Sequence, residues 1–311
     1  PTALIGAALP VLVQHLTTRL EHAGRRIGAL YGWNAAGAVA GCVLTGFWLL
    51  RLAGTQSTLL IAAGLNLTVF AAALLLRFAE GAGRAAVSTE TKETRPVLNA
   101  ERRLLIETAA VTGAAVLALE PVWARYLSYI VYNDMYVYYL MIAVILAGIG
   151  LGSLLYGAFL EKHLRSLAAL GWLEAALGLS AAACYLAAGW HYGRPESGLA
   201  ARHIQGLFED RFLGFLALRL FYATLVMFLP ALLSGIIFPL TCRLYCRDES
   251  AVGEDTGIIY AANTVGAVAG ALLGGLVLIP LAGVQSSLFL AAAATLYLAF
   301  RLLLTSRDGK K

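Results

Sequence analysis

The sequence is poor in charged residues, which make up 13% of its 311 positions. Soluble domains average about 25% charged residues, so this composition excludes an ordinary cytosolic enzyme. Only four cysteines are present, without zinc-type spacing, which excludes a disulfide scaffold and predicts no metal site. The chain also lacks a Ser-His-Asp order, an HExxH motif and a Walker motif. We therefore expect no catalytic residue and no cofactor within it.

Apolar residues are in excess, at 60% of the chain, and they fall in long runs. A run of about 20 apolar residues is long enough to cross a bilayer as a helix. The pattern predicts an all-α polytopic membrane bundle of about nine transmembrane helices, with the lipid bilayer as its partner. Pro230 and Pro239 predict that the long seventh segment is either kinked or strongly tilted. The nine segments cover about 1–18, 27–50, 55–76, 104–126, 135–160, 167–190, 213–245, 257–280 and 284–305.

The net charge of +5 does not indicate nucleic-acid binding, because the basic residues lie between apolar runs and form no patch. They are unevenly divided between the two predicted sides of the membrane. One side carries 17 of the 23 Lys and Arg residues and the other carries 6. Cytoplasmic loops retain basic residues, so we expect a cytoplasmic C-terminus in a bacterial-type inner membrane.

An internal repeat appears when the chain is aligned with itself at a shift of 229 positions. Gly28, Tyr31 and Asn34 then fall on Gly257, Tyr260 and Asn263. The match extends without a gap over further identical positions. They pair Pro1, Gly6, Pro10, Gly37, Ala38, Val39, Ala40, Gly41, Gly46, Gly54, Gln56 and Ser57 with Pro230, Gly235, Pro239, Gly266, Ala267, Val268, Ala269, Gly270, Gly275, Gly283, Gln285 and Ser286.

The repeat predicts how the chain is organised. The second copy includes three spans, beginning near 104, 135 and 167, that have no counterpart in the first. The unit is therefore six helices, and the chain holds three plus six of a 6+6 pattern. Because six is even, both copies share one orientation, as in major-facilitator-type folds. We expect the latter half of the first repeat at 1–78, a cytoplasmic linker at 79–103 and the second repeat at 104–311.

The repeated element places glycines four residues apart on one helix face, at Gly37 and Gly41 and again at Gly266 and Gly270. Such spacing favours close helix packing in lipid, and an asparagine can add an interhelical hydrogen bond. Asn34 and Asn263 are therefore interpreted mainly as polar clamps. A role in lining a substrate site is the alternative.

Two carboxylates lie within apolar segments, where a charged group is costly and usually faces a partner or a cavity. Glu120 either pairs with Arg125 or Arg219, or binds a cationic substrate or a proton. Glu174 has the same two interpretations, with neither favoured.

Several blocks resemble the membrane region of spermidine-synthase-like integral membrane proteins. They are residues 1–10, 26–34, 118–127 and 260–275. The resemblance implies a major-facilitator-like bundle that precedes a cytoplasmic aminopropyltransferase domain, with three further helices before Pro1. It carries no catalytic residue onto this chain. The positions that match its membrane signature are Tyr31, Asn34, Glu120, Trp123, Arg125, Tyr136, Tyr260 and Asn263.

Three functions are consistent with these patterns. The first is a membrane module that binds or moves a cationic amine past Glu120 and Glu174, or that anchors a cytoplasmic aminopropyltransferase. The second is a non-catalytic structural subunit whose glycine faces hold other membrane subunits. The third, a complete proton-coupled transporter, is disfavoured because three helices lack partners in the repeat.

Overall fold

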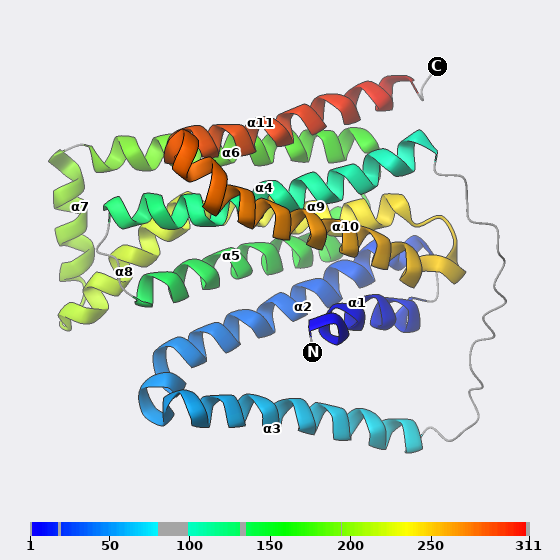
Figure 1. The fold of residues 1–311 in the computed structure, drawn as a ribbon, viewed down its shortest axis with the longest axis horizontal. Coiled ribbons are helices and arrows are strands. Elements are labelled where there is room, and N and C mark those ends of the chain that lie inside the picture. Colours follow the sequence, from blue (N-terminus) through cyan, green and yellow to red (C-terminus); the bar gives the residue numbers. More distant parts are fainter. Residues whose placement is uncertain (1, 18–19, 80–98, 131–134, 194, 309–311) are drawn as a thin grey trace.

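The computed structural model describes residues 2–17, 20–79, 99–130, 135–193 and 195–308. These residues form an all-helical bundle without a strand, as the sequence predicted (Figure 1). The predicted linker at 79–103 lies mostly outside the described residues. The α-helices are α1 (Thr2–Leu16), α2 (Ala23–Leu44), α3 (Leu50–Ala79), α4 (Ala100–Ile130), α5 (Met135–Leu155), α6 (Leu167–Tyr192), α7 (Pro195–Gly206), α8 (Arg211–Ala223), α9 (Leu229–Tyr245), α10 (Val252–Leu272) and α11 (Ile279–Asp308).

Six helical runs within the described part of the chain are long and apolar enough to cross a membrane. Two of these runs are unusually long, at Ala23–Leu76 and Glu249–Arg307, and each contains two α-helices joined by a π-helical turn. The short apolar helix Gly6–Leu16 lies outside the six. A multi-pass membrane protein follows from these lengths. The nine separate crossings remain a prediction.

The two long runs share one backbone device. In α3 the chain leaves the helical region at Gly54 (φ 73°, ψ 174°), and in α11 it does so at Gly283 (φ 79°, ψ 171°). Figure 1 shows α3 running in the opposite direction to α2 after this bend. The two glycines are 229 residues apart. At this shift α2 and α10 begin at equivalent residues, and α3 and α11 both begin and end at equivalent residues.

Replacing Gly54 or Gly283 with alanine is expected to lower the free energy of unfolding by about 1–3 kcal/mol, because only glycine adopts this backbone region without strain. The two losses should be similar, since the dihedral angles are nearly identical. Unfolding of the purified variants in mixed micelles, followed by circular dichroism, measures both. Gly64→Ala is the control, because Gly64 lies in the regular part of α3 with no described neighbour within 4 Å. Its free energy of unfolding should not fall. An undiminished stability in Gly283→Ala would contradict the expectation.

The long seventh segment contains a π-helical turn, η4 (Thr224–Phe228), between α8 and α9, while its kink or tilt stays a prediction. Pro230 has no backbone N–H and cannot continue the regular hydrogen-bond ladder into η4. A wider π turn accommodates the interruption without ending the helix. The chain thus runs from Arg211 to Tyr245 as one candidate span.

Glycines allow the central helices to approach closely. A Cβ placed on Gly28 of α2 would lie 2.7 Å from the Ser153 carbonyl oxygen of α5, and one on Gly235 of α9 would lie 2.2 Å from the Ile149 carbonyl oxygen. These glycines are therefore packed against backbone, as small residues are in membrane helix interfaces. The contacts join α2, α5 and α9 into the middle of the bundle.

Ion pairs gather at the end of the bundle where α4 and α10 begin and α11 ends, which we call the basic end. Arg102 and Asp255 form a buried pair with an N–O distance of 2.5 Å. Arg301 pairs with Glu107 at 2.5 Å, at the surface. Arg247 and Glu101 lie 3.5 Å apart and are also exposed. Three arginines among the described residues are therefore paired with carboxylates near the predicted cytoplasmic ends of these helices.

Candidate functional site

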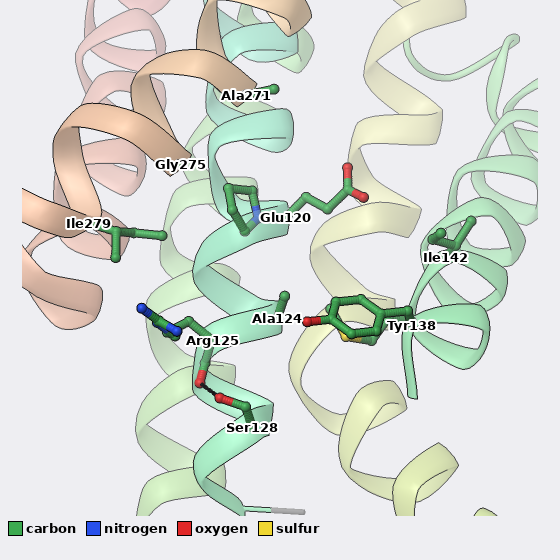
Figure 2. A pocket seen from close by; sticks show the side chains of 11 residues that line it. Glu120, Ala124, Arg125, Ser128, Tyr138, Ile142, Ala271, Gly275 and Ile279 are labelled. Atoms are coloured by element: carbon green, nitrogen blue, oxygen red, sulfur yellow. Dashed lines mark hydrogen bonds between the residues drawn. The ribbon is translucent and has the colours of Figure 1, made fainter. Parts of the chain in front are cut away.

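A groove of about 520 Å³ opens between α4, α5 and the turn that joins α10 to α11; we call it the Glu120 groove. Figure 2 shows Glu120 on α4 extending its carboxylate into this space, with Tyr138 of α5 across from it. Pockets of 300–1,000 Å³ are typical of small-molecule sites. The lining residues are Glu120, Pro121, Ala124, Arg125, Ser128, Tyr138, Met141, Ile142, Ala271, Gly275 and Ile279.

The charges in the Glu120 groove are not paired with each other. Figure 2 shows the Arg125 side chain directed toward Ile279, away from the Glu120 carboxylate. No ion pair joins Glu120 to Arg125 or to any other residue that the structure describes. Glu120 is half-buried, so its carboxylate is partly removed from solvent without a cation to compensate it. This geometry favours the second sequence interpretation, in which an external cation or proton is the partner.

A second, enclosed cavity of about 50 Å³ lies deeper, among α2, α4, α5, α9 and α10; we call it the Tyr31 cavity. Its polar lining comes from Tyr31, Thr112, Ser234, Thr241 and Asn263. On the same measure this cavity has about a tenth of the volume of the Glu120 groove, which is enough for a few water molecules. Of the two spaces, the Glu120 groove is the one with room for an organic cation.

Both repeated tyrosines pack around one aromatic residue beside the Tyr31 cavity. The Tyr31 ring of α2 lies 4.4 Å from the Phe238 ring of α9. The Tyr260 ring of α10 lies 6.0 Å from the same ring, in an edge-on arrangement. The two sequence copies therefore meet at α9, and their tyrosines contribute to helix packing in the middle of the bundle.

Glu174 of α6 is fully buried, at 0% exposure, and no cationic side chain pairs with it within the described residues. Thr112 Oγ1 of α4 lies 2.5 Å from its Oε1 and 2.7 Å from the Thr108 carbonyl oxygen. A hydroxyl has a single proton to donate, and a carbonyl can only accept. If Glu174 is ionised, its carboxylate and the Thr108 carbonyl oxygen compete for the single Thr112 hydroxyl proton. If Glu174 is protonated, it donates to Thr112 Oγ1, and the Thr112 hydroxyl is free to donate to the Thr108 carbonyl oxygen.

The remaining candidates are dispersed. Trp123 is completely buried in the hydrophobic core, and its indole Nε1 has no hydrogen-bond partner in the described structure. Tyr136 stacks on Phe47, with ring centroids 5.6 Å apart, and lies outside the Glu120 groove. Asn34 is exposed on α2, although its repeat partner Asn263 lines the Tyr31 cavity. The structure thus brings only Glu120 and Arg125 into one groove, and only Tyr31 and Asn263 into one cavity.

Sequence reasoning missed several polar residues near these sites. Ser128 and Tyr138 line the Glu120 groove, and Thr112 binds Glu174. Thr108 and Thr112 are one helical turn apart in an apolar segment, and this spacing is a signal that could have marked a polar face on α4. Tyr138 gave no such signal, because it is one of three tyrosines at the start of α5.

Comparisons with protein-family models, with curated proteins and with solved structures find no match to this chain.

Proposed function

We propose that this chain is the membrane module of a spermidine-synthase-like protein and that Glu120 binds the ammonium group of a cationic amine. One observation carries the proposal: a half-buried carboxylate, with no cationic partner among the described residues, points into a groove of suitable volume. Met141, Ile142 and Ile279 supply an apolar wall for the methylene chain of an amine. The Tyr138 ring adds an aromatic face, which attracts cations.

The finer architecture belongs to the same proposal. Nine crossings follow if the bends at Gly54 and Gly283 each separate two spans and α1 forms another. The matched starts of α2 and α10, and the matched bounds of α3 and α11, support a parallel three-plus-six repeat of the major-facilitator kind. The basic end, with the C-terminus, is then cytoplasmic in a bacterial-type inner membrane. A cytoplasmic aminopropyltransferase is the partner that the resemblance suggests.

The test is binding of radiolabelled spermidine to the purified chain in lipid nanodiscs. Glu120→Gln removes the charge and keeps the shape, and it should weaken binding about 10- to 100-fold, because charge-assisted hydrogen bonds contribute about 1.5–3 kcal/mol. Glu120→Asp should retain part of the affinity.

Two matched variants serve as controls. Glu254→Gln neutralises an exposed carboxylate at the start of α10, away from the groove, and should leave the affinity unchanged. Glu174→Gln should also bind normally, because Glu174 does not line the groove. Equal affinity in Glu120→Gln and in the unmodified chain would remove the basis of the amine proposal.

A structural subunit is the second candidate function. The observation that favours it is the exposed glycine face of α2, where no part of the described chain lies within 4 Å of a Cβ placed on Gly37 or Gly41. In this case Glu120 contributes nothing to ligand binding, and the membrane assembly is the measurable property.

A further inference from the structure

The repeated glycine element is packed in one copy and open in the other. On α10, a Cβ added to Gly266 would lie 1.8 Å from the Ala110 carbonyl oxygen of α4, and one added to Gly270 would lie 2.0 Å from that of Ala114. The backbone of α4 therefore fills this face. On α2, the equivalent Gly37 and Gly41 have no described residue within 4 Å of such a Cβ.

The same contrast extends along the next helix of each copy. Leu288 of α11 is 0% exposed, whereas Leu59, its equivalent in α3, is 66% exposed. Leu298 is 1% exposed, and its equivalent Val69 is 68% exposed. Helix α11 packs against α4 and α6, while α3 stands apart from the bundle (Figure 1).

The local conformation of the two copies is nevertheless the same. Thr58 Oγ1 donates to the Gly54 carbonyl oxygen, and Ser287 Oγ donates to the equivalent Gly283 carbonyl oxygen. Helices α2 and α10 also begin 229 residues apart, and so do α3 and α11. The copies therefore differ in what covers them and not in how they fold.

We infer that the Gly37–Gly41 face of α2 binds a transmembrane helix from outside residues 1–311, in the way that α10 binds α4. The expected partner carries small residues four positions apart, as α4 does at Ala110, Ala114 and Ala118, because only small side chains permit this backbone approach. The inference does not depend on amine binding at Glu120.

Two observations argue against lipid or a second copy as the covering group. Asn34 is exposed on this face, and an amide left in hydrocarbon without a partner is unfavourable. Its equivalent, Asn263, lies against α4, where its Oδ1 would be 2.8 Å from a Cβ on Gly113. A second copy cannot offer its own α4 in the same manner, because its α10 already covers that surface.

Cross-linking tests the inference in the membrane of the cell that makes the protein. A photoreactive phenylalanine replaces Ala38, which is exposed beside Gly41, and the cross-linked peptide is sequenced by mass spectrometry. We expect a peptide from outside residues 1–311, in an apolar segment with Ala, Gly or Ser at four-residue spacing. The same probe at Leu179, an exposed position on α6, should not capture it.

Substitutions at Gly37 and Gly41 then test whether the yield of the cross-linked adduct depends on these glycines. Gly37→Leu with Gly41→Leu should reduce its yield more than 10-fold. The thermal stability of the isolated chain should be unchanged, because both positions face open space. Gly41→Ala, a smaller change, should give an intermediate yield. A peptide from a second copy, an adduct with lipid alone, or a yield that survives the leucine variant would each overturn the inference.

Discussion

Replacing Gly266 or Gly270 with alanine is expected to lower the free energy of unfolding by about 3 kcal/mol, at the upper end for overpacking, because the new methyl group meets backbone that cannot rotate away. A Cβ at Gly266 lies 1.8 Å from the Ala110 carbonyl oxygen, and one at Gly270 lies 2.0 Å from that of Ala114. Relief requires α10 and α4 to separate, and these two helices share the most extensive contact in the bundle. Unfolding in mixed micelles, followed by circular dichroism, gives the loss.

The equivalent glycines of the first copy provide an internal control. Gly37→Ala and Gly41→Ala should leave the stability of the isolated chain unchanged or raise it by up to about 1 kcal/mol, because alanine is the better helix former and nothing opposes its methyl group. The four variants share the same local sequence and differ only in the neighbouring helix. A similar loss in all four would show that these glycines serve the helix itself and not its packing.

This contrast explains how far the sequence could predict the fold. The apolar runs predicted where the long helices lie, because the length of a span depends only on local composition, but α7 lies in none of these runs. The self-alignment also predicted which helices resemble each other. It could not predict that Asn34 is exposed and Asn263 is packed, because that difference depends on α4, a helix from elsewhere in the chain.

The candidate site, too, could be predicted from the sequence only in part. Glu120 was identified because a carboxylate in an apolar run is unusual. Whether it pairs with Arg125 depends on which way two side chains extend from α4, and the residue spacing allows both outcomes. The contact between Thr112 and Glu174 joins positions 62 residues apart, so no local pattern could predict it.

A second large effect is expected from Arg102→Ala at the basic end. The substitution leaves the Asp255 carboxylate buried without its cation, and breaking such a pair typically lowers stability by about 3–5 kcal/mol. Both side chains are almost fully buried, at 9% and 8% exposure. The Arg102 guanidinium also lies 4.1 Å from the centre of the Tyr245 ring. The same substitution therefore removes a cation–π contact and the packing of the Arg102 side chain on this ring.

Three comparisons separate the effect of burial from the effect of charge. Arg247→Ala breaks an exposed pair with Glu101 and should lower stability by less than about 1 kcal/mol. Arg102→Met combined with Asp255→Leu removes both charges and should recover most of the loss, because two apolar side chains need no compensation. Added salt should weaken the Arg247 effect and leave that of Arg102 nearly unchanged, since buried charges are poorly screened. If the double variant is as unstable as Arg102→Ala, the unpaired carboxylate is not the cause, and the helix ends are held together by the shape of the Arg102 side chain against Tyr245.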